Sequence, residues 1–108
     1  MQKFRRAFAA NPSPRLDTAP ISQIADTVVY VCATPMYDNL MDRDDLFEKR
    51  IAEMLIDYDP EYDVILDYGD PMIFALMIYF LSDDKIKIGR YSRKDGQYTV
   101  KEIDQWWN

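Results

Sequence analysis

Residues 62–82 read YDVILDYGDPMIFALMIYFLS, and they say more about the architecture than any other part of the chain. Residues 62–68 form a short apolar run typical of a buried strand, and Gly69 then supplies a turn. Asp70 is a good helix N-cap, and Pro71 suits the first helical position, where its missing N–H is harmless. The segment therefore predicts a strand, a turn and a helix over residues 72–82, apolar nearly all round and so buried on most sides.

The sequence on either side of this segment extends the pattern. Residues 27–33 are β-branched and apolar, as in a strand buried on both faces. An amphipathic pattern predicts a helix that is capped by Asp42 or Asp44 and runs through Ile56. Residues 85–91 and 97–103 alternate around an Asp-Gly turn, which predicts a hairpin. We expect an α/β fold: a small Rossmann-like βαβα unit of two or three layers, with its two strands parallel and a right-handed crossover, followed by a C-terminal β-hairpin.

The first 20 residues predict a separate organisation. They contain three of the six prolines, and the segment 11–14 reads NPSP, which interrupts any regular element. We expect residues 1–20 to form a flexible basic arm and residues 21–108 to form a single acidic α/β domain.

Composition limits the class of protein. The 108 residues suit one domain with one core. The single Cys32 cannot form an internal disulfide, and no apolar run approaches the roughly 20 residues that a membrane helix needs. We therefore expect a cytoplasmic protein that makes no membrane contact.

Charge is unevenly distributed along the chain. Residues 1–15 carry a formal charge of +4, residues 16–84 carry −13, and residues 85–108 carry +3. Residues 51–84 contain no basic residue at all. An acidic body repels nucleic acid and attracts basic protein surfaces. We predict an acidic face that binds such a surface, made of Asp57, Asp59, Glu61, Asp63, Asp67 and Asp70.

A second candidate site lies where the two predicted parallel strands end. Ligands of open α/β sheets usually bind beyond the carboxyl ends of the strands. If the two strands are neighbours, the loops there bring together Thr34, Tyr37, Asp38, Asn39, Asp67, Gly69 and Asp70. Such a crevice suits a hydroxylated or cationic ligand, or a phosphate with Mg²⁺. Asp70 is most simply an N-cap and Gly69 most simply a turn residue.

The absence of several residue types argues against catalysis. The chain has no His and one Cys, so the usual general base and the usual zinc ligands are missing. It contains no phosphate-binding glycine motif and no nucleophile elbow. We assign no catalytic residue and no metal ligand, and we expect no cofactor, with Mg²⁺ needed only for the crevice alternative.

The strand, turn and helix of residues 62–82, the strand 28–32 and the closing hairpin together resemble a loose group of small phage-encoded α/β proteins. The resemblance implies a phage product but transfers no activity. The layout is also similar to nucleoside-processing Rossmann-like folds such as the deoxyribosyltransferases. Those enzymes place a catalytic Glu in the helix after the second strand, and residues 72–81 contain none.

Three functions follow from these patterns. The first is a non-enzymatic interaction protein, plausibly phage-encoded, whose acidic face binds a basic surface of a host protein and inhibits or modulates it, in some cases by imitating DNA. The alternative is a nucleotide- or nucleoside-binding protein or enzyme with a carboxylate site in the crevice. The third is a nucleic-acid accessory acting through basic residues: Lys3, Arg5, Arg6, Arg90, Arg93 and Lys94. An exposed hairpin edge would also invite a homodimer by sheet extension.

Overall fold

The computed structural model describes residues 3–12, 19–32, 44–81 and 85–103, with side chains in the third range described from residue 48. The chain forms a mixed five-stranded sheet in the order β2-β1-β3-β4-β5. β1 to β4 are parallel, and β5 runs antiparallel to β4. The elements in chain order are β1 (Phe4–Ala9), the 3-10 helix η1 (Ala19–Gln23), β2 (Ala25–Tyr30), α2 (Asp44–Met54), β3 (Asp63–Leu66), α3 (Pro71–Phe80), β4 (Ile86–Ser92) and β5 (Gln97–Ile103).

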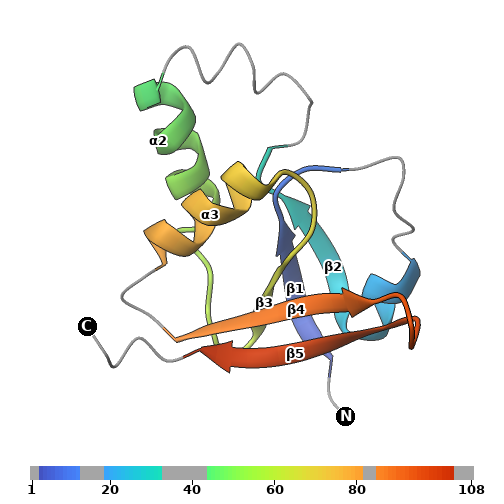
Figure 1. Cartoon of the computed structure of the whole chain (residues 1–108). Coiled ribbons are helices and arrows are strands. Elements are labelled where there is room, and N and C mark those ends of the chain that lie inside the picture. Colours follow the sequence, from blue (N-terminus) through green and yellow to red (C-terminus); the bar gives the residue numbers. More distant parts are fainter. Residues whose placement is uncertain (1–2, 13–18, 33–43, 82–84, 104–108) are drawn as a thin grey trace.

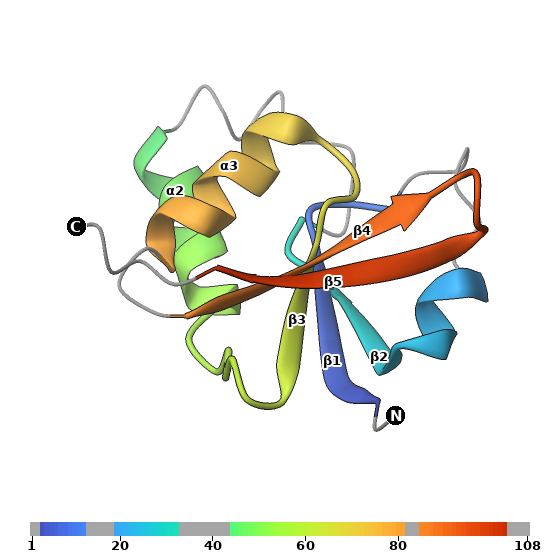
Figure 2. The same ribbon diagram turned by 60° about the horizontal axis from the view of Figure 1, so that its bottom comes forward.

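The direction of the crossovers explains where the helices lie. Figures 1 and 2 show α2 and α3 together on one face of the sheet. The connections from β2 to β3 and from β3 to β4 step across the sheet in the same direction, whereas the connection from β1 to β2 steps the opposite way. Right-handed crossovers therefore place α2 and α3 on one face and η1 on the other.

Each face of the sheet has its own apolar cluster, because successive strand residues point to opposite sides. Phe8 and Ile65 pack with helical residues that include Ile51, Ile73 and Met77. Their neighbours along the strands pack on the opposite side against Ile21 of η1, in a cluster that contains Ala7, Ala9, Val64 and Leu66. The strands β1 and β3 are thus buried on both faces where they pair.

The strand expected over residues 27–33 is observed as β2, but it is less enclosed than its apolar run predicted. β2 stands at the end of the strand order, and its residues Asp26 and Thr27 are exposed. Within β2 only Ala25 is buried, and the next buried residues, Val31 and Cys32, follow the strand. The strands buried on both faces are β3 and the second half of β1, which is the neighbour of β2.

The expectation of a flexible arm over residues 1–20 is wrong for residues 4–9. They form β1, which lies between β2 and β3, and Ala7, Phe8 and Ala9 are fully buried. β2 and β3 are therefore parallel but are not neighbours, contrary to the crevice prediction. The proposed domain boundary at residue 20 fails for the same reason, since the sheet includes segments from both sides of it.

Several local predictions are confirmed. α2, α3 and the hairpin occur where the sequence placed them, and the α/β class is correct, although the Rossmann-like arrangement is not established. Asp70 caps α3 by accepting hydrogen bonds from the amides of Met72 at 2.9 Å and Ile73 at 3.3 Å. α3 is less enclosed than expected, since Met72 and Tyr79 are 53% and 70% exposed. No helix in the described ranges has the length and apolarity needed to cross a membrane.

Candidate interaction surface at the amino end of the sheet

A buried carboxylate begins the central strand β3. Asp63 is 0% exposed, and it lies beside Arg6 in the register of β1 and β3. Its two oxygens accept hydrogen bonds from Arg5 at 3.2 and 3.0 Å and from Arg6 at 3.3 and 2.9 Å. The backbone N–H of Asp59 donates a further hydrogen bond of 2.9 Å. A buried charge is tolerated only when it is paired and hydrogen-bonded in this way.

The same contacts fix the charge state of Asp63. Burial by itself would raise the pKa of the Asp63 carboxyl, because a low-dielectric environment disfavours the charged form. The hydrogen bonds from Arg5, Arg6 and the Asp59 amide outweigh burial and hold this pKa below its usual value. Asp63 is therefore a carboxylate near neutral pH, compensated by two guanidinium groups.

This cluster also fixes the shape of the segment that precedes β3, residues 55–62, which we call the α2–β3 loop. Arg6 donates from Nη2 to the carbonyl oxygen of Asp57 at 2.6 Å, and Asp63 holds the Asp59 amide. Tyr58 is buried edge-on against Phe8, with ring centroids 5.9 Å apart. Its hydroxyl accepts a 3.2 Å hydrogen bond from the backbone N–H of Lys87 in β4. The loop is thus attached to β1, β3 and β4.

The outward side of the α2–β3 loop combines apolar and acidic side chains. Ile56 is 74% exposed and Tyr62 is 52% exposed. Asp57 and Glu61 are exposed beside them, Asp59 is half-buried, and Glu53 is exposed near the end of α2. Asp59 shapes this arrangement locally, because its Oδ1 accepts a 2.9 Å hydrogen bond from the Glu61 amide. Arg5 also belongs to this surface, because its guanidinium carbon lies 5.8 Å from the ring centroid of Tyr62. Exposed apolar and aromatic side chains with polar neighbours are common contact residues in protein interfaces.

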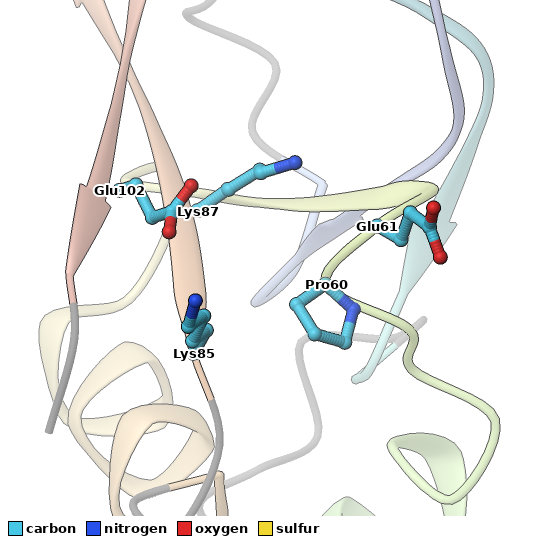
Figure 3. A pocket seen from close by; sticks show the side chains of 5 residues that line it. All are labelled: Pro60, Glu61, Lys85, Lys87 and Glu102. Atoms are coloured by element: carbon cyan, nitrogen blue, oxygen red, sulfur yellow. The ribbon is translucent and has the colours of Figure 1, made fainter.

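Two hollows flank this loop on the side of β4. The first has a volume of about 240 Å³, and Figure 3 shows the five side chains that line it: Pro60, Glu61, Lys85, Lys87 and Glu102. The second, of about 320 Å³, is lined by Lys3, Phe4, Glu61, Tyr62 and Lys87. Glu61 and Lys87 line both hollows, and the amino group of Lys87 lies 5.5 Å from the ring centroid of Phe4. The acidic loop therefore adjoins a groove that contains three lysines.

The six residues predicted to form one acidic face are not brought together. Asp57, Asp59 and Glu61 lie on the α2–β3 loop at the amino end of β3. Asp67 and Asp70 follow the carboxyl end of the same strand, where Asp67 lies 3.8 Å from Arg90. The assignment of Asp63 to an exposed face is wrong, because Asp63 is fully buried and paired with Arg5 and Arg6.

The predicted ligand crevice is only partly within the described chain. Thr34, Tyr37, Asp38 and Asn39 lie outside the described residues. In the described part, Asn11 accepts a 2.7 Å hydrogen bond from the amide of Asp70, whose carboxylate caps α3. Gly69 adopts a positive φ of 89°, and a Cβ there would meet Asn11 Oδ1 at 2.6 Å. The turn is thus closely packed against Asn11. No group of three or more His, Cys, Asp or Glu in the ranges that the structure describes is placed to hold a metal ion.

The overall charge of the described surface differs from that of the sequence. Among the residues whose side chains are described, acidic and basic residues are equal in number, 11 of each. The formal net charge of −6 therefore arises from residues outside this set. The described side chains thus have no overall negative charge, and their carboxylates could attract a basic partner only where they gather locally.

Sequence reasoning missed several residues of this surface. Arg5 and Arg6 were assigned to a flexible arm, and Ile56 and Tyr62 were not selected as contact residues. A carboxylate at the start of an apolar strand was a usable signal, because Asp63 needs donors if that strand is buried. The sequence does not identify which of its 13 basic residues donate hydrogen bonds to Asp63.

Comparison with known proteins places the chain in a family. A search of curated proteins returned no match, and neither did a search of solved structures. A family model built for phage proteins matches residues 1–105, nearly the whole chain. The match agrees with the resemblance to small phage-encoded α/β proteins, and the chain belongs to the family described as Phage Pam3 gp32-like protein.

Proposed function

We propose that this phage-family protein has no catalytic role and acts by binding another protein. Its α2–β3 loop docks on a basic surface of a host protein and modulates or inhibits that protein. The observation that carries the proposal is the exposure of Ile56 and Tyr62, together with the carboxylates of Asp57 and Glu61, on a loop that buried contacts hold in place.

The two kinds of side chain have separate roles in binding. Exposed apolar and aromatic residues supply most of the affinity when a partner buries them, and Tyr is enriched among such contacts. The carboxylates of Glu53, Asp57 and Glu61 speed the encounter with a basic surface and disfavour acidic partners. A basic surface on the partner is also the kind of surface that binds nucleic-acid phosphates. A protein that covers it would therefore block nucleic-acid binding.

Because the α2–β3 loop is already held in place, binding should cost less conformational entropy. Ordering a flexible loop on association consumes part of the interaction free energy. Here Tyr58 is buried and Asp63 holds the Asp59 amide before any partner arrives. The loop therefore presents its side chains without a large ordering cost.

The test compares two variants that remove the same number of carboxylates. The loop variant carries Asp57→Asn, Asp59→Asn and Glu61→Gln, and the carboxamide introduced at position 59 keeps an oxygen for the backbone N–H of residue 61. The control variant carries Asp26→Asn, Asp67→Asn and Asp95→Asn, which are exposed side chains away from the loop. Partners are captured from bacterial lysate at low and high salt, identified by mass spectrometry, and titrated as purified proteins.

We expect a basic partner that binds the wild type and the control variant equally and binds the loop variant at least about tenfold more weakly, since several rim charges contribute up to about 1 kcal/mol each. Ile56→Ser should weaken binding by a similar factor. Binding that is insensitive to salt, or that the loop variant retains in full, would contradict the proposal.

A further inference from the structure

The last strand of the chain forms one margin of the sheet. β5 stands at the end of the strand order, and all seven of its residues pair with β4, from Ile103 opposite Ile86 to Gln97 opposite Ser92. Figures 1 and 2 show β5 along the outer margin of the sheet. Within the described ranges, no strand pairs with its other edge. Such an edge exposes a row of backbone donors and acceptors that can pair with another strand.

β5 carries few of the features that usually protect an edge. Proteins block edges with short strands, prolines, bulges or charges. β5 is seven residues long, contains no proline and pairs with β4 without a bulge. Its only charged residues are Lys101 and Glu102, and Val100 is 39% exposed opposite Gly89, which has no side chain.

A second copy of β5 fits this edge in one register better than in the others. In a two-fold antiparallel pair centred on Val100, all seven residues find partners: Val100 faces Val100, Thr99 faces Lys101, and Tyr98 faces Glu102. No like charges stand directly opposite each other. Centring the pair on Lys101 or on Glu102 would place that residue opposite its own copy, and like charges in directly opposite positions are destabilising.

We propose that the protein forms a two-fold homodimer in which β5 pairs with β5 of a second copy around Val100. The dimer joins the two five-stranded sheets into one and places both α2 helices on the same face. It does not depend on the function proposed above. Where a partner offers two binding sites, the dimer presents two α2–β3 loops to it and increases avidity.

Disulfide trapping tests the register. In the proposed pair the two copies of residue 100 are directly opposite, about 4.5–5.5 Å apart between Cα atoms, which is within the range for a disulfide. Two copies of residue 99 are diagonal, about 7–8 Å apart, which is too far. Val100→Cys should therefore give a covalent dimer on mild oxidation, and Thr99→Cys should not. Both variants and the wild type keep Cys32, which is buried.

Light scattering after size exclusion tests the assembly without a cross-link. The wild type should have about twice the chain mass of 12.8 kDa, Val100→Lys should be monomeric because it sets two lysines opposite each other, and Val100→Thr should remain dimeric. Circular dichroism melting confirms that each variant folds. A monomeric wild type would overturn the proposal and leave the edge for a strand of another protein. Equal cross-linking at positions 99 and 100 would overturn it as well.

Discussion

The two ends of β3 carry the same residue type in opposite settings. At the amino end, Asp63 is fully buried and accepts five hydrogen bonds, four of them from Arg5 and Arg6. Beyond the carboxyl end, Asp67 is 46% exposed and has one long contact of 3.8 Å with Arg90. Asp63 therefore organises the surface around it, whereas Asp67 lies on a surface that would change little without it.

This difference shows how acidic residues divide their roles. A carboxylate that is buried with two arginines stabilises a loop and has no charge to offer a partner. Asp57 and Glu61, which that loop carries, remain exposed and available. The acidic residues 57–63 are thus partly structural and partly exposed at the surface.

The largest effect is expected from Asp63→Ala. Removing the carboxylate leaves Arg6, whose side chain is 23% exposed, without its partner and leaves the Asp59 amide without an acceptor. Breaking a buried ion pair in this way should lower the free energy of unfolding by about 3 kcal/mol. Urea denaturation measures the loss. Asp67→Ala is the matched control and should change stability by less than about 0.5 kcal/mol. Similar losses in both variants would remove the distinction between the two ends.

A smaller effect is expected at the carboxyl end from Asp70→Ala. This change removes the cap that accepts hydrogen bonds from the amides of Met72 and Ile73. Loss of an N-cap should reduce the free energy of unfolding by about 1 kcal/mol. Asp70→Asn keeps a capping oxygen, so it should lower the free energy of unfolding by only a few tenths of about 1 kcal/mol. If thermal melting shows the two variants to be equally unstable, the cap is not the role of Asp70.

The smallest effect is expected from pH, since it reports the titration of one group. The pKa of Asp63 is lower in the folded protein than in the unfolded chain, so the unfolded chain takes up the proton first. The stability that Asp63 contributes is complete above about pH 4, near the ordinary Asp pKa, and is lost as the pH falls toward the folded pKa. Urea midpoints measured across this range should fall less steeply for Asp63→Asn than for the wild type. Parallel curves would show that Asp63 titrates normally.

Local patterns were sufficient for most of the helices and for the hairpin. Asp70, Pro71 and the apolar run that follows specify α3 through capping and helix geometry, which depend on residues a few positions apart. The Asp-Gly turn specifies the hairpin in the same way. β1 escaped prediction because Arg5 and Arg6 interrupt its apolar pattern and two prolines follow it closely.

The sequence selected the acidic site residues by charge alone, and the structure places them in different settings. Asp57, Asp59 and Glu61 were chosen for their charge and do lie together on one loop. Asp63 was chosen on the same ground but is buried, because its partners Arg5 and Arg6 are 58 and 57 positions away in the chain. Ile56 and Tyr62 gain significance only because the loop leaves them exposed.

By itself, the sequence determined the α/β class, the position of α3 with its cap, the hairpin, and the segment in which acidic residues gather. These depend on periodicity, capping and turn chemistry, which act over short distances along the chain. Only the tertiary structure shows that residues 4–9 form a central strand, that Asp63 is buried as a carboxylate paired with two arginines, and that the α2–β3 loop is held in place. Those outcomes depend on pairing between residues far apart in sequence, where burial selects partners that no local pattern identifies.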